Sequence, residues 1–330
     1  MKKLIFSMIV ALMATVAARA QQIAVVSDGT TTLYHTLQEA IEGAPTGSVI
    51  YLPGGGFPIS DDVKIDKKLT IIGIGHYAKS GNVDGVTTIS GNLFFTTESD
   101  DSAVLGCYIS GNINIGDESS PVNSILIKYC NLNSVQILNS LCTGTYVNQN
   151  YIRGTSNFGN TEVTICNNVI GKICNVAAGL ISYNICCHYC SGAARYSQYY
   201  PALENVNNST IISNIFRGEA VWYSYFHSGE SCVLSNNLYL GWSVGEEPVI
   251  IDASAEDLFE DINNWTVSPV SNFHFKEAYK EYESQVGIYA GSSFSDKGMA
   301  PVPYIIAKRV DEQTDASGML NVRIRVSASN

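Results

Sequence analysis

The sequence predicts an all-β protein: a right-handed parallel β-helix, or solenoid, with an N-terminal α-helical cap, a C-terminal closing segment and a terminal hairpin. The main observation is a recurring motif, an Asn followed by a short apolar strand that ends in a Gly or a bend. Copies begin at positions 150, 168, 184, 214 and 237, with a weaker copy at 131, so successive Asn residues stand 19, 18, 16, 30 and 23 positions apart. One short strand per roughly 20 residues is typical of stacked β-rungs.

The second observation is the brevity of the apolar runs, which are mostly three to five residues long and end in Gly, Asn, Asp or Ser. Those residues favour turns, each for its own backbone reason. Because Asn tolerates left-handed backbone conformations and carries an amide, its repetition predicts a ladder of stacked amides at one corner. Rungs are expected at 63–65, 69–73, 87–89, 93–95, 104–109, 113–115, 125–129, 135–138 and 163–166.

The third observation is a single amphipathic helix near the start, between a strand at 24–27 and a strand at 49–52. Thr36 and Glu39 have the spacing of a capping box, and Gly43 is suited to end the helix. Leu37, Ala40 and Ile41 share one face. A lone helix before stacked rungs is expected to cover the open apolar end of the coil.

The chain divides into four parts. Residues 1–20 combine Lys2 and Lys3, an apolar run and a small-residue cleavage site, and they predict a secretory signal peptide. Residues 21–60 form the N-terminal strand and helix cap, and residues 61–265 form the β-helix coils. Residues 266–330 form the closing segment and terminal hairpin. No later segment is long enough to predict a membrane span.

The C-terminal part loses the repeat. A short helix is expected at 254–259, a strand at 273–275 and another rung-like piece at 287–291. Runs at 304–310 and 320–326 predict a hairpin, because Val322, Ile324 and Val326 alternate with Arg323 and Arg325. The edge of this hairpin is a candidate contact for a protein partner.

Composition limits the function. The formal net charge of −11 excludes nucleic acid as a favoured partner, since that binding needs clustered Lys and Arg. Few charges and many Asn, Ser, Thr, Gly and Tyr favour a secreted protein that faces a neutral polymer. The nine cysteines are mostly expected as small core residues, with a disulfide among Cys186, Cys187 and Cys190 left open. No metal site is predicted there, because a second ligand pair is missing.

Two segments carry the resemblance to a known family. The entry from Val26 through Leu37–Ile41 to Val49–Gly55, followed by the Asn-apolar coils, resembles right-handed parallel β-helix proteins of the pectin-lyase-like superfamily. The end of the chain, from 271–275 through 287–291 to 301–305, is similar to secreted β-helix proteins of Bacteroidetes-type bacteria. The resemblance implies the fold and covers nearly all of the exported chain. It implies no activity, because none of the superfamily's catalytic motifs occurs in this sequence.

Candidate catalytic residues follow from what a polysaccharide lyase needs: a cation for the substrate carboxylate and a base for the α-proton, often with calcium. Arg153 and Arg217 follow the same corner of their rungs, and Lys172 stands one position later in its own repeat. The alternative is a set of solvated edge residues that pair with Glu162 and Glu219. Calcium is expected only if the protein is a lyase, and otherwise no cofactor is predicted.

Histidines and aromatic residues supply the other candidates. His188 and His227 are potential bases in the central coils, although a lone histidine is more often structural. Paired carboxylates for glycoside hydrolysis are conceivable from Glu204, Glu219, Glu230 or Asp117 and Glu118. Two insertions break the repeat, and insertions in repeat proteins emerge on one face, often the binding face. They supply the ligand-binding candidates Tyr196, Tyr199, Tyr200, Trp222, Tyr223 and Tyr225, which are suited to stack on sugar rings.

Two functions are therefore carried forward. The first, which the sequence favours, is a non-catalytic secreted protein that binds an extracellular polysaccharide or glycan, or serves as a scaffold or adhesin. The second is a divergent polysaccharide lyase or glycoside hydrolase. In an enzyme, Arg153, Lys172 and Arg217 should converge on a groove with a carboxylate or His in reach, whereas in a scaffold they should be dispersed.

Overall fold

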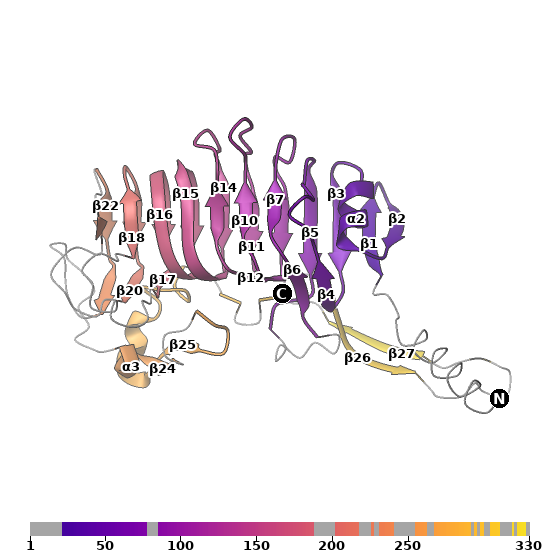
Figure 1. Cartoon of the computed structure of the whole chain (residues 1–330). Coiled ribbons are helices and arrows are strands. Elements are labelled where there is room, and N and C mark those ends of the chain that lie inside the picture. The colour runs from indigo at the N-terminus through magenta and orange to yellow at the C-terminus, as the bar shows by residue number, and fades with distance from the viewer. Residues whose placement is uncertain are drawn as a thin grey trace, which may run out of the picture.

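The computed structural model describes residues 22–77, 85–187, 202–217, 226–227, 231–240, 255–262, 267–291, 294–295, 298–299, 304–310, 319 and 322–327. Within these residues the chain is mainly β, and 23 strands join in one long, mostly parallel sheet. Figure 1 shows the coils stacked along one axis in sequence order. Equivalent strands of successive coils pair in parallel and form three ladders, A, B and C, an arrangement consistent with a β-solenoid. The predicted signal peptide lies outside the described residues.

Each coil runs from ladder A through B to C. Ladder A contains β3 (Ser48–Leu52), β5 (Leu69–Gly73), β8 (Ala103–Leu105), β11 (Leu126–Lys128), β14 (Thr145–Asn148), β19 (Thr210–Ile212) and β22 (Val233–Ser235). Ladder B contains β4 (Gly55–Pro58), β6 (Thr87–Ser90), β9 (Tyr108–Ile109), β12 (Asn131–Leu132), β17 (Ile185–Cys186), β20 (Ile215–Arg217) and β23 (Leu238–Leu240). Ladder C contains β7 (Leu93–Phe95), β10 (Ile113–Ile115), β13 (Val135–Ile137), β18 (Leu203–Val206) and β21 (Phe226–His227). The long strands β15 (Tyr151–Cys166) and β16 (Val169–Ser182) pass through all three.

A short helix, α2 (Leu37–Gly43), forms where the capping box predicted one. The Thr36 side chain accepts a hydrogen bond from the Glu39 backbone N–H, and the Glu39 carboxylate accepts one from Thr36. Leu37, Ala40 and Ile41 are buried and belong to the main core. The helix lies beside β1 (Ile23–Ser27) and β2 (Thr30–Tyr34), at the N-terminal end of the coil (Figure 1). These two strands are antiparallel additions to ladder A.

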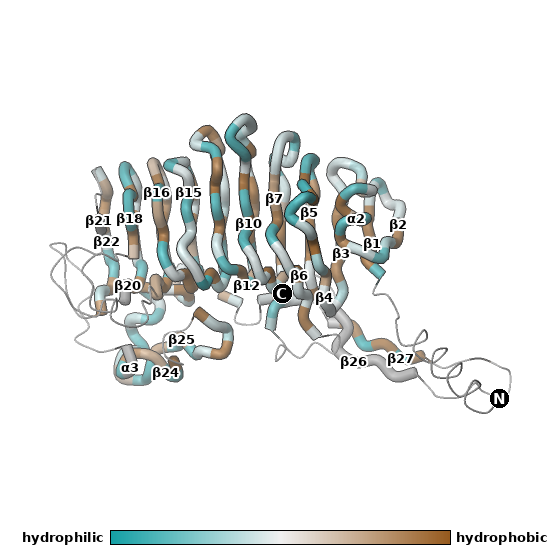
Figure 2. Tube along the Cα trace, viewed as in Figure 1, coloured by the Kyte–Doolittle hydropathy of each residue, from teal (hydrophilic) through white to brown (hydrophobic). Residues whose placement is uncertain are grey.

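The main core fills the inside of the coil. Alternate residues of each short strand point inward, so Ile, Leu, Val and Phe recur rung after rung, which Figure 2 shows as repeated brown segments. Cys107, Cys130, Cys142 and Cys186 belong to this core. The prediction of small core cysteines is confirmed for these residues. Cys107, Cys130, Cys142, Cys166, Cys174 and Cys186 are free thiols.

The predicted amide ladder is confirmed at the corner between ladders A and B. The side chains of residues 150, 168, 184, 214 and 237 are all fully buried. In each of the first four, the backbone N–H and the side-chain Nδ2 both donate to the Oδ1 of the next Asn, over 2.9–3.0 Å. The parallel register places Thr87, Cys107 and Cys130 at the same position in earlier coils. We call these eight residues the corner column.

The ladder residues do not themselves adopt the left-handed conformation. The positive φ angle falls one residue earlier, at Gly106, Tyr129, Gln149, Asn167, Tyr183, Ser213 and Asn236, which we call the left-handed corner. Asn131 is not a ladder member, because it pairs with Tyr151 and so stands one position beyond the corner column. The weaker copy of the motif was therefore assigned one residue out of register. The rung expected at 104–109 is likewise two strands, β8 and β9, separated by this corner.

A second core lies outside the coil, against ladder B. Its coil side is Tyr151, Val169, Ile185, Ile215 and Leu238, which point away from the main core. Its other side comes from α3 (Ala255–Leu258), β24 (Phe259–Asp261), β25 (Asn272–Phe275) and the segment after the 3₁₀ helix η3 (Glu277–Tyr282). Figure 1 shows these elements below the later coils. The helix expected at 254–259 is confirmed at Ala255–Leu258, whereas Phe259 begins β24, and the strand expected at 273–275 is confirmed as part of β25.

After η3 the chain runs back along the coil as a strap, residues 285–291 and 294–295. This segment consists of turns, so the expected rung at 287–291 is wrong. The strap is held by the left-handed corner, whose polar groups point out of the coil. The contacts are Asn236 Nδ2 to Gln285 O, Gly287 N to Ser213 O, Asn167 Nδ2 to Ile288 O and Ala290 O, and Ser295 N to Gln149 Oε1, at 2.9–3.1 Å.

The chain ends in the predicted hairpin. Strands β26 (Tyr304–Val310) and β27 (Val322–Ser327) pair antiparallel and form a separate two-stranded sheet. In Figure 1 the hairpin extends away from the coil, near its N-terminal end.

Candidate functional site

The outer face of ladder C carries a continuous polar surface. Its central row consists of residues that succeed one another in register, one per coil: Phe94, Asn114, Gln136, Asn157, Cys174, Glu204 and His227. In the early members of this row the neighbouring residues point inward and are buried, for example Ile113 and Ile115 around Asn114. Beside this row stand Asn112, Ser134, Thr155 and Lys172. We call residues 112, 114, 134, 136, 155, 157, 172, 174 and 204 the polar face.

Hydrogen bonds between coils fix the side chains of the polar face. Ser134 Oγ donates to Asn112 Oδ1 at 2.8 Å. Gln136 Nε2 donates to Ser134 Oγ at 2.8 Å and to Thr155 O at 3.0 Å. Asn157 Oδ1 accepts from Gly159 N and Asn175 Nδ2, both at 3.0 Å. Because every amide is held by at least one bond, the face is preorganised by the sheet beneath it.

Several polar atoms of this face are not used by the fold. Among the described residues, no hydrogen bond is made by Asn112 Nδ2, Asn114 Oδ1, Gln136 Oε1, Thr155 Oγ1 or Asn157 Nδ2. None of them is a buried unsatisfied atom, so water reaches each one. The face therefore presents two donors, two acceptors and a hydroxyl on adjacent rungs, spaced about 4.8 Å apart.

A charged cluster stands at the C-terminal end of the polar face. The Lys172 ammonium is almost fully buried and pairs with the Glu204 carboxylate of the next coil, which is 40% exposed. Cys174 Sγ lies 3.8 Å from the same Glu204 oxygen. Burial raises the pKa of the Cys174 thiol to about 11, with the Glu204 charge adding to the rise and Lys172 opposing it. Cys174 is therefore a neutral thiol at pH 7 and not an activated nucleophile.

One coil before the polar face, the central row has an aromatic residue, Phe94. The half-buried Phe94 ring lies under the Lys64 ammonium, whose Nζ is 3.5 Å from the ring centroid. Such a cation over an aromatic face is an attractive contact in its own right. The outer face of ladder C therefore runs from an aromatic ring through amides and hydroxyls to an ion pair.

Of the three predicted cations, Arg153 and Arg217 belong to ladder B and Lys172 belongs to ladder C. The register puts Arg153 and Arg217 at one position of ladder B, three coils apart, which corresponds to about 14 Å along the stack. Arg153 reaches toward earlier coils: its Nη1 donates to Asn131 Oδ1, and its Nη2 donates to Ile109 O at 3.1 Å. Its guanidinium also lies 5.0 Å from the Tyr108 ring centroid. Lys172 belongs to ladder C, and its partner is Glu204 rather than Glu162.

Most of the other candidates lie outside the described residues. These are His188 and the aromatic residues Tyr196, Tyr199, Tyr200, Trp222, Tyr223 and Tyr225. For Arg217 and His227 only the backbone is described. β21 places His227 beside Glu204 in register, as the next member of the central row. The structure thus brings Lys172, Glu204 and the backbone position of His227 to one face.

The polar face could have been found from the sequence by its alternation. Two ladder C strands read apolar–polar–apolar, Ile113-Asn114-Ile115 and Val135-Gln136-Ile137. The sequence analysis predicted these strands as rungs but did not consider their central polar residues, Asn114 and Gln136, as candidates for binding. Glu204 was considered only as one of several carboxylates, and Cys174 only as a core residue.

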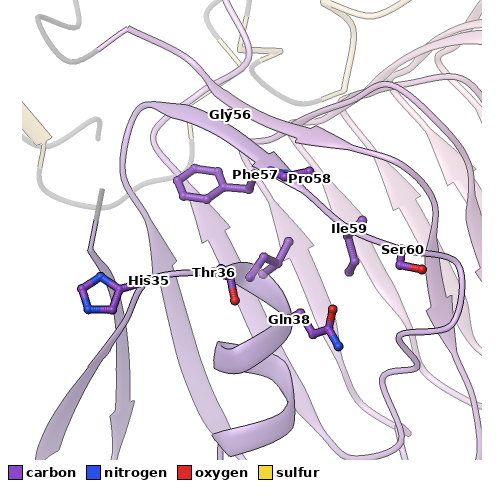
Figure 3. Close-up of a pocket in the computed structure, with 9 residues that line it drawn as sticks. His35, Thr36, Gln38, Gly56, Phe57, Pro58, Ile59 and Ser60 are labelled. Carbon is purple, nitrogen blue, oxygen red and sulfur yellow. The ribbon is translucent and has the colours of Figure 1, made fainter. Parts of the chain in front are cut away.

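A small pocket lies at the N-terminal end of ladder B, between the start of α2 and β4 (Figure 3). Its volume is about 600 Å³. Phe57 and Ile59 line it and are themselves buried. Two of its polar side chains already serve the fold, since Thr36 caps α2 and Gln38 donates to Glu42 at 2.8 Å. We assign no ligand to this pocket.

Two further observations concern metals and membranes. In the part of the chain that the structure describes, no group of three or more His, Cys, Asp or Glu side chains is placed to hold a metal ion. No helix there has the length and apolarity that crossing a bilayer requires. Cys186 lies in the main core and Cys187 in the outer core, so these neighbours face opposite sides of the sheet.

Comparisons with protein-family models, curated proteins and solved structures return no match for this chain. The functional argument therefore rests on the geometry of the polar face.

Proposed function

We propose that the protein is a secreted, non-catalytic carbohydrate-binding protein and that it binds an extracellular polysaccharide along the polar face of ladder C. The supporting observation is the set of unused hydrogen-bonding atoms on Asn112, Asn114, Gln136, Thr155 and Asn157. The proposal also takes residues 1–20 as the export signal. It places the protein in the pectin-lyase-like group of right-handed β-helices without that group's chemistry.

The chemistry of the face suits a neutral chain of sugars. Sugar hydroxyls both donate and accept, and amides offer both functions from one side chain. Each hydrogen bond contributes only about 0.5–1.5 kcal/mol, so a long ligand that spans several rungs is needed for useful affinity. The net charge of −11 repels a polyuronate, which favours a neutral polysaccharide.

The cations support binding over catalysis. A lyase needs a cation that is free to neutralise the substrate carboxylate. Lys172 is already paired with Glu204, and Arg153 is already bonded to Asn131 and to the Ile109 carbonyl. Cys174 remains protonated, so the cluster also lacks a thiolate nucleophile.

The binding test uses a matched pair of threonines on one strand. Thr155 and Thr164 both point outward from β15, but Thr155 lies on ladder C and Thr164 on ladder A. Affinity electrophoresis against neutral and acidic polysaccharides should show retardation by a neutral polymer. We expect Thr155→Ala and Gln136→Ala to weaken it several-fold, and Thr164→Ala to leave it unchanged. An equal loss of retardation in Thr155→Ala and Thr164→Ala contradicts the placement of the binding site on ladder C.

The enzyme alternative is favoured by one observation only, the Lys172–Glu204 pair beside the register position of His227. It is tested by mass spectrometry of the same polysaccharides after incubation with the protein, with and without calcium. Unsaturated products establish a lyase, and saturated fragments that disappear in Glu204→Gln establish a hydrolase. Retardation by a polymer that stays intact supports the binding proposal.

A further inference from the structure

One histidine of the early coils is enclosed by the C-terminal segment of the chain. His76 follows β5, is only 5% exposed, and packs edge-on against Tyr151 of ladder B, with ring centroids 5.5 Å apart. Gly298 lies directly against the ring, because a Cβ added at Gly298 would come within 1.8 Å of His76 Nε2. Two distant parts of the sequence therefore meet at this imidazole.

The segment that encloses the histidine is apolar where it meets the coil. Its described residues are 294–295, which end the strap, and 298–299, and we call these four residues the cover. Phe294 packs edge-on against Tyr151, with ring centroids 5.6 Å apart. Phe294 and Met299 are both buried. The cover thus keeps water from one side of ladder B.

The two ends of the cover are held differently. Ser295 N donates a hydrogen bond to Gln149 Oε1 of the coil at 2.9 Å. Gly298 N donates to Ser295 O at 3.0 Å, which is a bond inside the cover itself. Among the described residues, no hydrogen bond joins Gly298 or Met299 to the coil. In this part of the chain, the end of the cover that touches the histidine is held by packing.

The site suits a neutral imidazole and not an imidazolium. Neither ring nitrogen of His76 has a hydrogen-bond partner among the described residues. A protonated ring has two N–H donors and a charge, and burying them without acceptors is costly. Burial accordingly lowers the pKa of His76 to about 4, and only its own backbone carbonyl opposes the shift.

No described carboxylate faces the ring. The described titratable group in contact with His76 is Tyr151, a phenol. A carboxylate close to the cover would be an alternative source of pH dependence, so the charged residues near this site in the sequence also matter. They lie outside the described residues and are Lys79, Asp84, Asp296 and Lys297.

We propose that the cover is released by acid: a proton taken up by the His76 ring detaches the cover from the coil. The detached ring is solvated as an imidazolium, whereas the enclosed ring stays neutral, so a falling pH favours the open form. Opening uncovers Tyr151 and frees the chain that leads to the terminal hairpin, which begins at Tyr304. The strap from Gln285 to Ala290 stays in place, because asparagine and serine groups that do not titrate hold it.

The size of the effect follows from the two protonation equilibria. In the open form His76 takes up a proton near pH 6.5, and in the closed form near pH 4. The preference for the closed form is therefore complete above pH 6.5 and is lost as the pH falls toward 4. From pH 7 to pH 5, the ratio of open to closed forms should rise about 20-fold.

Hydrogen exchange followed by mass spectrometry measures this opening. The protection factors of amides in 294–299, corrected for the intrinsic effect of pH on exchange, should fall about 20-fold from pH 7 to pH 5. Their exchange should not depend on low concentrations of urea, because a local opening exposes little surface. Unchanged protection between the two pH values overturns the proposal. A urea dependence equal to that of the Asn184 and Asn214 amides also overturns it, since the cover then opens only with the whole coil.

Three variants assign the proton. His76→Phe should abolish the pH dependence of protection in the cover. His35→Phe, at an exposed histidine, and Asp296→Asn should both retain it. A pH dependence that survives in His76→Phe and disappears in Asp296→Asn assigns the effect to the carboxylate and overturns the proposal.

A fourth variant tests the contact while the histidine is kept. Gly298 has φ +56°, and its added methyl group would overlap His76 Nε2. Gly298→Ala should therefore open the cover already at pH 7, with fast exchange in 294–299 at both pH values and full protection of the amide ladder. Cover amides that are as protected in Gly298→Ala as in the unsubstituted chain contradict the proposed closure on His76.

Discussion

The early and late coils fill the corner column, and bond to the backbone there, with different side chains. At the corner column, the late coils have five fully buried asparagines, whereas the early coils have Thr87, Cys107 and Cys130. The Asn184 amide donates to Ser182 O, two residues earlier, at 3.0 Å. Cys130 Sγ lies in the equivalent place, 3.3 Å from Lys128 O. A thiol makes the same kind of contact as an amide, but sulfur is a weak donor and a weak acceptor.

The two regions also differ outside the coil. From Tyr151 onward, ladder B is covered by the second core, so each late coil is packed on its inner and outer sides. In the early coils the equivalent positions are Thr88, Tyr108 and Asn131, and polar groups and Arg153 replace the apolar cover. The late coils therefore depend on amides and on the C-terminal segment, whereas the early coils depend mainly on the inner core. This difference makes the two regions respond differently to substitution.

The largest expected effect follows the removal of one rung of the amide ladder. Asn184→Ala deletes the donor to Ile165 O, Ser182 O and Asn214 Oδ1, and the acceptor for the Asn168 backbone N–H. Several buried polar groups are then left without partners, at about 1–3 kcal/mol each, so we expect a loss of about 5 kcal/mol in the free energy of unfolding. Urea unfolding followed by circular dichroism measures it.

Cys107→Ala is the control in the early coils, and it should lower the free energy of unfolding by about 1 kcal/mol because it removes only weak sulfur contacts. Similar losses of unfolding free energy in Asn184→Ala and Cys107→Ala contradict the inference that the amides stabilise the corner column more than the thiols do.

The next effect concerns the outer core. Phe273 is fully buried and its ring packs edge-on against Phe259, with centroids 5.5 Å apart. Phe273→Ala should destabilise the C-terminal segment by about 3–5 kcal/mol while the main core of the coil stays intact. Limited proteolysis should then cut after residue 255 and leave a resistant coil fragment. Tyr108→Ala, on the uncovered part of ladder B, should leave the cleavage pattern unchanged.

The third effect is a dependence of stability on pH that is due to His76. This residue lies where Gly298, beyond the strap, meets the coil. His76 is buried edge-on against Tyr151, close to Gly298, and neither ring nitrogen has a hydrogen-bond partner among the described residues. Burial lowers the pKa of His76 to about 4. In the unfolded chain His76 binds a proton near pH 6.5. The stability that the buried neutral ring gives to the folded state is therefore present in full above that pH and is lost as the pH falls toward 4.

Between pH 6.5 and pH 5 the expected loss at His76 is about 2 kcal/mol, from 1.36 kcal/mol per pH unit. Unfolding midpoints at pH 7 and pH 5 measure it against His76→Phe, in which this part of the pH dependence should vanish. His35→Phe, at an exposed histidine, should retain it. An unchanged pH profile in His76→Phe contradicts the assignment.

The sequence predicts those features that repeat or follow local chemistry. The recurring Asn identified the ladder at residues 150–237, and the Thr36–Glu39 spacing identified the helix, because both depend on contacts close in sequence or in register. The strap was not predicted, since Ile288, Ala290 and Ser295 contact coils more than a hundred positions earlier, at Asn167 and Gln149. The Lys172–Glu204 pair was missed for a related reason: an insertion separates two residues that neighbour each other in the stack.

The smallest effect tests whether the early coils use Arg153 as a structural group. The guanidinium spans two earlier coils through Asn131 Oδ1, Ile109 O and Ser110 O, and burial lowers its pKa while Tyr108 opposes that shift. Lys at this position has no forked donor geometry. Arg153→Lys should therefore lower the free energy of unfolding by about 1 kcal/mol, measured by urea unfolding, and leave polysaccharide retardation unchanged. A loss of retardation at unchanged stability places Arg153 in the ligand site and extends that site from ladder C to the uncovered part of ladder B.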